Sequence, residues 1–290
     1  MSAQKKKDLV FSCEFFPPRT EKGIAKLKEV RGQLSIIGPR YYSVTFGAGG
    51  STRDRTFETV LEIQGKDQGS KIESAPHLSC IGASRSEIKN ILTAYKQHGV
   101  SHVVALRGDL PSGTVDYGDF HYANHLVEFI RAQTGDYFHI EVGAYPEVHP
   151  QAKSAQTDLI NFKRKVDAGA NGAVTQYFYN VDAYLRFVDC CLDLGISIPI
   201  VPGIMPIHHY PQLARFSDIC GAEIPRWLRK RLENFSEGED EALLSFTTDV
   251  LSHLCQQLLD AGAPGLHFYT LNRAEPTLAI WHNLGLSTKK

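Results

Sequence analysis

The sequence predicts a single (β/α)8 barrel, the TIM-barrel class of α/β fold, from three observations. Short apolar segments alternate with amphipathic segments along the whole chain, and the alternation can be followed through eight repeats. Several of the helix-like segments end in Gly and run directly into the next strand, as at Gly99 and Gly195, which is typical of short αβ loops. The length of 290 residues suits one such barrel, whose repeats commonly occupy about 250 residues. Eight alternations of this size favour a closed barrel over an open sheet.

The expected strands are short runs rich in β-branched and aromatic residues, bounded by Gly, Pro or charged residues. They comprise residues 9–16, 41–46, 72–80, 102–107, 138–145, 172–178, 198–204 and 265–271. The clearest expected helices carry apolar residues three or four positions apart, and they comprise residues 84–98, 124–134, 155–168, 181–194 and 240–261. The segment 220–239 is more polar, and we expect a short insertion there before the last long helix. Because no linker or low-complexity segment divides residues 1–290, we expect one catalytic domain.

Composition excludes several classes of protein. The chain is 42% hydrophobic and 22% charged with a net charge of −1, which is typical of a soluble globular protein without a basic surface for nucleic acids. Its six cysteines show no C-x-x-C pair and no zinc-ligand spacing, so we expect reduced thiols in a cytoplasmic protein. The longest apolar run, residues 196–207, contains three prolines and is too short to span a bilayer. We expect a homo-oligomer whose partners are small molecules, with neither nucleic acid nor membrane among them.

One stretch, SHVVALRGDLP at residues 101–111, organises the expected site. Its apolar run stops at Arg107, Gly108 and Asp109, and this leaves a cation and a carboxylate where the strand ends. In a barrel, catalytic groups come from the C-terminal ends of the strands. Asp109 alone is explained more simply as a turn carboxylate. Several other strands end in polar residues too, however, and together they favour an active site.

The first strand places a carboxylate inside this end of the barrel. Val10, Ser12 and Glu14 share one face of the strand, whereas Cys13 and Phe15 share the other. A buried glutamate is costly unless it is protonated or paired, so we expect a raised pKa; the alternative is an edge carboxylate paired with a nearby arginine, Arg19. The same alternation places a polar residue near the C-terminal end of five further strands, namely Thr45, His77, Tyr145, Gln176 and His267.

A glycine-rich loop at residues 47–52, GAGGST, resembles the dinucleotide-binding turn, but its sixth position is Thr52, so the G-x-G-x-x-G pattern fails. The loop is explained equally well as a flexible turn and as a place where a ligand approaches bare backbone. No expected strand end carries a lysine, which disfavours an imine-forming aldolase. The histidines near the strand ends lack a paired-ligand motif, and we expect no metal at the site.

A stripe of polar residues on the expected helix 155–168 is more informative. Asp158, Asn161 and Lys165 fall at helical spacing with Arg164 beside them. Such a stripe is usually a solvated helix face. It could equally bind the hydroxyls and diphosphate of a nucleotide at the barrel rim.

Eight segments carry a resemblance to a known family: CEFFPPRT (13–20), YYSVTFGAGGSTRDRT (41–56), PHLSC (76–80), LRGDLP (106–111), GAYPEVHP (143–150), FKRKVDAGANGAVTQYFYN (162–180), PGIMPI (202–207) and HFYTLNR (267–273). In them the chain resembles the bacterial methylenetetrahydrofolate reductases, which consist of the catalytic domain alone. The segments follow the family order across nearly the whole chain. Departures are confined to loops, chiefly 111–122 and 208–213.

The resemblance implies non-covalent FAD, NADH or NADPH as co-substrate, and ping-pong reduction of 5,10-methylenetetrahydrofolate to 5-methyltetrahydrofolate in one-carbon and methionine metabolism. Residues that match the family's FAD contacts are Thr45, Ala48, His77, Arg107, Gly108, Asp109, Tyr145, His149, Ala152, Asp158, Asn161, Arg164 and Lys165. Those that match its folate contacts are Asp109, Gln176, Gln212, Phe216 and Arg273. Glu14 matches the general acid, and Asp109 is expected to hold the pterin and to influence the flavin potential.

The expected chemistry sets a requirement on Glu14. Opening the imidazolidine ring of the substrate requires protonation of a weakly basic aryl amine, which suits a carboxylic acid with its pKa raised to ~6–7 from ~4.3. Two other classes of protein remain open from the residues alone. A phosphate-binding barrel lyase or aldolase would be colourless, and a non-catalytic flavin- or folate-binding protein would not be reduced by a nicotinamide.

Overall fold

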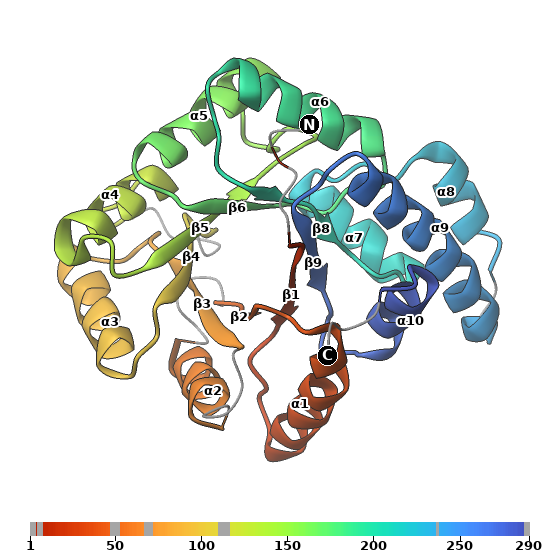
Figure 1. The fold of residues 1–290 in the computed structure, drawn as a ribbon, viewed down its shortest axis with the longest axis horizontal. Coiled ribbons are helices and arrows are strands. Elements are labelled where there is room, and N and C mark those ends of the chain that lie inside the picture. The colour runs from red at the N-terminus through yellow and green to blue at the C-terminus, as the bar shows by residue number, and fades with distance from the viewer. Residues whose placement is uncertain are drawn as a thin grey trace.

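The computed structural model describes residue 4 and residues 8–46, 53–66, 72–109, 117–235 and 238–286. Within this part of the chain, nine strands form one parallel sheet in the order β7-β6-β5-β4-β3-β2-β1-β9-β8. The strands lie around a common centre and the helices lie outside them, as Figure 1 shows. The predicted (β/α)8 barrel is therefore confirmed.

The strands lie close to their predicted positions. They are β1 (Val10–Phe15), β2 (Tyr41–Val44), β3 (Glu73–Ser79), β4 (His102–Leu106), β5 (His139–Ala144), β6 (Gly172–Thr175), β7 (Ile200–Val201), β8 (Gly203–Ile204) and β9 (Gly265–Tyr269).

The seventh predicted strand, residues 198–204, is divided into β7 and β8 at Pro202. Proline has no backbone N–H to donate to a neighbouring strand. Its carbonyl still accepts a hydrogen bond from the backbone N–H of His267, at 3.0 Å. Because β7 pairs with β6 while β8 pairs with β9, the two halves act as one barrel strand and close the sheet. The eight predicted strands thus appear as nine.

The helices cover the outside of the sheet. They are α1 (Glu21–Leu34), the 3-10 turn η2 (Ser35–Ile37), α2 (Arg53–Lys66), α3 (Arg85–Gln97), α4 (Ala123–Thr134), α5 (Ala155–Asp167), α6 (Val181–Asp193), α7 (Tyr210–Cys220), α8 (Arg226–Leu232), α9 (Asp240–Asp260) and α10 (Glu275–Asn283). The polar segment predicted as an insertion contains α8, which buries Leu228 and Leu232. No helix among the described residues is long and apolar enough to cross a membrane.

Local sequence signals account for the ends of several helices. Ser84 caps α3 in a reciprocal capping box with Glu87, and the Ser154 hydroxyl accepts from the backbone N–H of Thr157 at the start of α5. The predicted C-terminal glycines adopt left-handed backbone, with φ of 73° at Gly99 and 75° at Gly195. These turns return the chain to the sheet within a few residues.

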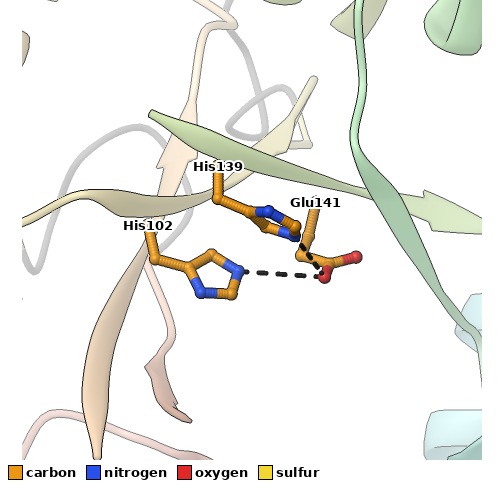
Figure 2. A group of neighbouring side chains, drawn as sticks. All are labelled: His102, His139 and Glu141. Atoms are coloured by element: carbon orange, nitrogen blue, oxygen red, sulfur yellow. Dashed lines mark hydrogen bonds and ion pairs between the residues drawn. The ribbon is translucent and has the colours of Figure 1, made fainter. Parts of the chain in front are cut away.

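Alternation along each strand divides the side chains between two environments. Cys13 and Phe15 of β1 pack in the main apolar core with residues from the surrounding helices, whereas Ser12 and Glu14 belong to the other face. Three polar residues of that inner face, His102, His139 and Glu141, lie together near the N-terminal ends of β4 and β5 (Figure 2). A cavity opens at the opposite, C-terminal end of the barrel.

Candidate functional site

A cavity of about 440 Å³ opens at the C-terminal ends of the strands. This volume lies within the range of about 300–1,000 Å³ usual for small-molecule sites. Its lining comes from seven strands, β1 to β6 and β9, and from α7, which lies across one side. Seven residues that the sequence singled out line the cavity, namely Glu14, His77, Asp109, Tyr145, Gln176, Phe216 and His267.

Glu14 lies between two histidines in the cavity wall. Its Oε2 is 3.2 Å from Nε2 of His77 on β3 and 3.7 Å from Nε2 of His267 on β9. Its side chain is only 14% exposed. Burial by itself raises the pKa of Glu14, but the charges and hydrogen bonds of the two histidines outweigh burial and lower the pKa to about 2. Glu14 is therefore an anion in this structure at neutral pH.

The raised pKa that the sequence predicts for Glu14 is wrong for the protein in this arrangement. The prediction rests on burial, and the residues next to Glu14 in the chain do not form its surroundings. Phe15 points to the opposite face of β1 and packs in the main core, and Phe16 is largely exposed. The partners of Glu14 instead come from β3 and β9, and they are histidines rather than an arginine.

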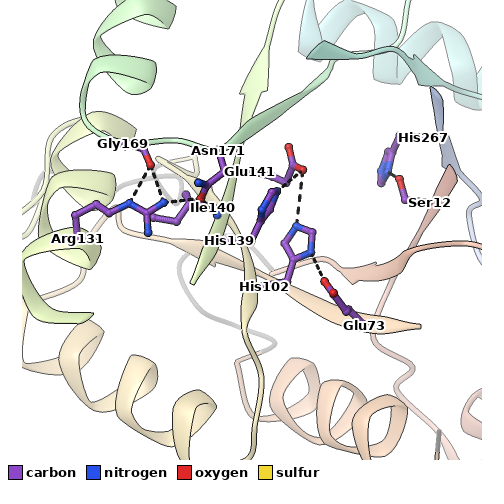
Figure 3. A network of polar contacts seen from close by, with 10 residues as sticks. All are labelled: Ser12, Glu73, His102, Arg131, His139, Ile140, Glu141, Gly169, Asn171 and His267. Atoms are coloured by element: carbon purple, nitrogen blue, oxygen red, sulfur yellow. Dashed lines mark hydrogen bonds and ion pairs between the residues drawn. The ribbon is translucent and has the colours of Figure 1, made fainter. Parts of the chain in front are cut away.

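A buried serine, Ser12, contacts one of the two histidines beside Glu14. The Ser12 hydroxyl is 2.7 Å from Nδ1 of His267, and Ser12 is fully buried (Figure 3). Because that contact occupies one ring nitrogen, the other nitrogen of His267 faces Glu14. These contacts place four polar side chains in a row, Ser12, His267, Glu14 and His77, and the longest step, 3.7 Å, lies between His267 and Glu14.

The exit of β4 has the geometry of a tight turn. Gly108 has φ of 82°, and a Cβ at this position would lie 1.8 Å from the Ser79 hydroxyl oxygen. Arg107 turns away from the cavity, since its guanidinium donates to the Gln151 side chain at 2.6 Å. Asp109 is exposed and lies at the mouth of the cavity. After this turn, the Arg107 side chain contacts Gln151, whereas Asp109 lies at the mouth of the cavity.

The loop after β5 forms one rim of the cavity. The rings of Tyr145 and His149 meet edge to face at 4.5 Å. Asp158 at the start of α5 accepts a hydrogen bond from the backbone N–H of His149 at 2.8 Å, and Ala152 donates to the His149 carbonyl. Burial, with the Asp109 carboxylate nearby, raises the pKa of Tyr145 to about 12. Four of the predicted cofactor contacts are therefore brought together at this rim.

The predicted stripe on α5 is divided between the rim and the surface. Lys165 reaches back to the sheet, where its ammonium donates to the carbonyl of Gly143 in the cavity wall. Burial lowers the pKa of Lys165 to about 8, against the opposing effect of the Asp158 carboxylate. Arg164 and Asn161 instead contact each other, with 3.0 Å between guanidinium and amide oxygen. Lys165 is the member of the stripe that reaches the sheet, at a residue of the cavity wall.

The residues that match folate contacts are only partly assembled. Gln176 follows β6 and lines the cavity, and Phe216 of α7 lines both this cavity and a small adjoining one. Gln212 lies in the adjoining cavity. Arg273 is exposed and lines neither of the two.

Two predicted cofactor contacts, Thr45 and Ala48, follow β2 in the chain. Thr45 follows this strand and is partly buried, and it does not line the cavity described above. Its carbonyl accepts a hydrogen bond from the Thr56 hydroxyl at 2.9 Å. Ala48 belongs to the loop 47–52, which lies outside the described residues, and so do residues 110–116 of the loop after β4.

The cavity also contains residues that were not selected as site residues from the sequence. Ser43 and Tyr269 line it, and the strand alternation that identified Glu14 could have identified both. Tyr177 is harder to foresee, because its hydroxyl contacts Ser217 of α7 at 3.0 Å and the crossing of α7 over the barrel has no local signature. Cys220 of the same helix also lines the cavity.

Comparisons with known proteins agree with this geometry. A family model described as methylenetetrahydrofolate reductase matches residues 1–285. The chain is 44% identical over 276 residues to the 5,10-methylenetetrahydrofolate reductase of Salmonella typhimurium, with 95% of this chain and 90% of that protein covered. It is 40% identical over 290 residues to a probable methylenetetrahydrofolate reductase (NADH) of Oryza sativa, with 96% of this chain and 48% of that protein covered.

A solved structure has the same fold. It is an uncharacterized protein from Clostridium thermocellum that binds two copies of 5-methyl-5,6,7,8-tetrahydrofolic acid. The TM-score is 0.66 with 16% sequence identity, and 96% of each chain is covered. At this identity the likeness supports the barrel alone. The family match and the curated relatives lead further: the chain belongs to the methylenetetrahydrofolate reductase family.

Proposed function

We propose that this protein reduces 5,10-methylenetetrahydrofolate to 5-methyltetrahydrofolate, with NADH or NADPH as electron donor and bound FAD as carrier. The observation that supports this proposal most strongly is Glu14, a buried carboxylate held between His77 and His267 in the wall of a ligand-sized cavity. A proton must be delivered in this reaction, and the cavity supplies a chain of groups able to deliver it.

The residues around the cavity fit FAD. Its walls combine aliphatic side chains with the rings of Tyr145 and Tyr269, which suits a flat heteroaromatic ring. At the rim, the Lys165 ammonium lies against a neutral carbonyl with its pKa lowered by burial, so an anionic diphosphate there would stabilise its charged form. We assign the diphosphate to Lys165 and Arg164, and the ring to the cavity beside Tyr145. When bound, FAD supplies a hydride carrier between the nicotinamide and the folate.

The protein's own residues would bind and orient the folate. The Asp109 carboxylate at the cavity mouth can accept two hydrogen bonds from the amino-pyrimidinone edge of the pterin. The Gln176 amide can complete the polar recognition from the end of β6. Phe216, on the α7 side of the cavity, can stack on the aromatic part of the substrate.

Proton delivery follows from the ion pair of Glu14. In this structure the carboxylate is ionised and its histidine partners stabilise the charge. A substrate that fills the cavity displaces water, and lower polarity favours a neutral acid beside a neutral imidazole over the charged pair. We propose that the proton passes from His77 or His267 to Glu14 when the folate binds, and from Glu14 to the aryl amine as the ring opens.

The activity can be tested by the product. Purified protein is incubated anaerobically with methylenetetrahydrofolate and either NADH or NADPH, and the folates are separated and identified by mass. The proposal expects 5-methyltetrahydrofolate with at least one donor, and comparison of the two donors gives the preference. A protein that retains its flavin yet forms no product with either donor contradicts the proposal.

Lys165 and Arg164 provide a test of where the diphosphate binds. We expect Lys165→Ala combined with Arg164→Ala to lose FAD during gel filtration while the barrel stays folded, because the variant lacks both cations assigned to the diphosphate. Lys163→Ala is a matched control on the same helix, since Lys163 contacts Asp167 at 2.6 Å instead. The measurements are flavin content per chain and circular dichroism. Wild-type flavin content in the folded double variant would rule out this placement.

Glu14 also makes stability depend on pH. Because the pKa is lowered to about 2 in the folded protein from ~4.3 in an unfolded chain, the ionised form stabilises the fold above pH ~4.3. This contribution, at most ~3 kcal/mol, is lost as the pH falls toward 2. We expect the difference in the free energy of unfolding between the wild type and Glu14→Gln, measured with urea, to become smaller as the pH falls from 5 to 3. An advantage that stays constant over this interval would show that the ion pair does not persist in solution.

A further inference from the structure

A second group of ionisable side chains lies at the N-terminal end of the barrel, away from the cavity. His102 is the first residue of β4, and His139 and Glu141 come from the start of β5. One oxygen of Glu141 lies 3.1 Å from Nε2 of His139 and 3.8 Å from Nε2 of His102. One ligand atom from each of the three side chains lies within 4.8 Å of the others, and Figure 2 shows them converging on one point.

Two atoms of this group are buried without a hydrogen-bond partner among the described residues. They are Nε2 of His102, whose side chain is 1% exposed, and Oε2 of Glu141, whose side chain is 8% exposed. A polar atom that is buried and unpaired costs roughly 1–3 kcal/mol, so such atoms are usually satisfied by water, an ion or a ligand. Nε2 of His102 faces the Glu141 carboxylate, and the unpaired Oε2 belongs to that same carboxylate.

The other nitrogen of His102 determines which tautomer is present. Its Nδ1 is 3.1 Å from Oε2 of Glu73 on β3. A dashed line in Figure 3 marks this contact. Because a carboxylate only accepts hydrogen bonds, Nδ1 carries the proton in this contact and Nε2 keeps a free lone pair. A histidine oriented in this way by a carboxylate is the usual arrangement behind a metal-binding imidazole.

The neighbouring residues leave room for the group and a path to it. A Cβ at Gly172 of β6 would lie 2.5 Å from Oε2 of Glu141, so glycine is needed for the carboxylate to occupy its position. The ring of Tyr41 packs against His102 with 4.3 Å between centroids and closes one side. The side chains of His139 and Glu73 are 31% and 41% exposed, so an ion can enter from solvent beside them.

We propose that His102, His139 and Glu141 bind a Zn²⁺ ion at this end of the barrel. Two imidazole nitrogens and one carboxylate suit zinc and disfavour Mg²⁺ or Ca²⁺, which prefer oxygen ligands. Ligand atoms about 2.0–2.1 Å from a tetrahedral ion lie ~3.3 Å apart, and the distances from Oε1 of Glu141 to the two histidines, 3.1 Å and 3.8 Å, lie on either side of this value. Water from the exposed side completes the coordination.

The role of this ion is structural. It would join the first residues of β4 and β5, and the contact between His102 and Glu73 would link β3 to them. The N-terminal face of a barrel of this class contributes to stability, whereas its chemistry lies at the opposite face. Zinc is therefore expected to raise the thermal stability and to leave both hydride-transfer steps unchanged.

The test uses untagged, FAD-loaded, full-length protein treated with a chelator and then titrated with Zn²⁺ against a chromophoric competitor. We expect one tightly bound equivalent per chain and a rise in the unfolding temperature on binding. Co²⁺ in place of zinc should give the intense visible bands of a tetrahedral site. His102→Gln should abolish both signals, and Glu73→Gln, which removes only the orienting carboxylate, should weaken zinc affinity ~10–100-fold.

Controls separate this site from binding at the surface. His253→Gln removes an exposed histidine of α9 and should bind zinc as the wild type does. If His102→Gln does not fold, the partly exposed His139→Gln and Glu73→Gln provide the same comparison. The proposal is wrong if the wild type binds no stoichiometric zinc. It is equally wrong if zinc binds as tightly to the folded His139→Gln and Glu73→Gln variants as to the wild type.

Discussion

Glu14→Gln is expected to bind FAD and to accept hydride from the nicotinamide at close to the wild-type rate, yet to be reoxidised by methylenetetrahydrofolate at least ~10²-fold more slowly. Only the second half-reaction requires a proton at the substrate amine. A glutamine cannot take the proton from His77 or His267 and cannot pass it on. Stopped-flow absorbance follows flavin bleaching and recovery separately and so measures both halves in one sample.

The control for this experiment is Glu128→Gln, which removes an exposed carboxylate of α4 and should leave both halves unchanged. A Glu14→Gln variant that is reoxidised at the wild-type rate would show that Glu14 is a structural carboxylate. The proton would then come directly from a histidine of the same chain. Under that outcome His267→Gln, rather than Glu14→Gln, would slow reoxidation.

Asp109→Asn is expected to have the second largest effect, again on the folate half-reaction. Charge-assisted hydrogen bonds to a carboxylate contribute about 1.5–3 kcal/mol, which corresponds to folate binding weakened by roughly 10- to 100-fold. The variant should also raise the flavin midpoint potential, because an anion at the cavity mouth disfavours the more negative reduced flavin. Folate titration of the reduced enzyme and a redox titration measure the two effects.

Asp182→Asn, an exposed carboxylate in the first turn of α6, serves as the control for charge alone. It should change neither folate binding nor the potential. If Asp109→Asn matches this control in both measurements, the pterin edge must be recognised by other groups, with the Gln176 amide as the first candidate.

Much of the fold could be predicted from the sequence because its signals are local. Strand alternation placed Ser12 and Glu14 on one face, and the glycines after the helices marked the returns to the sheet. The division of the seventh strand at Pro202 was missed, although the physical reason is local, since a proline cannot donate to the neighbouring strand. The part before Pro202 pairs with β6 and the part after it pairs with β9.

The electrostatics of the site could not be predicted in the same way. The pKa of Glu14 depends on His77 and His267, which approach it only when β9 pairs with β1 and β3 takes its place on the far side of β2. The direction of Arg107 likewise depends on Gln151, which belongs to the loop after the next strand. Residues that are distant in the chain thus determine the protonation of Glu14 and the direction of the Arg107 side chain. Strand alternation determines only which face of the strand a side chain occupies.

The cluster of His102, His139 and Glu141 shows the same limit. No spacing in the sequence resembles a zinc motif, because the ligands come from adjacent parallel strands in register, with His102 opposite His139. A site of this kind becomes visible only when the strands are paired. The cluster lies at the N-terminal end of the barrel, opposite the cavity. The sequence gives no reason to expect a metal at that end.

The central claim is that this chain passes hydride from a nicotinamide to methylenetetrahydrofolate, and an absorbance spectrum of the purified protein tests it most directly. We expect a yellow protein with a flavin spectrum that is bleached anaerobically by NADH or NADPH and restored by methylenetetrahydrofolate. A colourless protein would favour a phosphate-binding lyase or aldolase. A yellow protein that neither nicotinamide bleaches would be a flavin-binding protein without this activity, and either result would contradict the account.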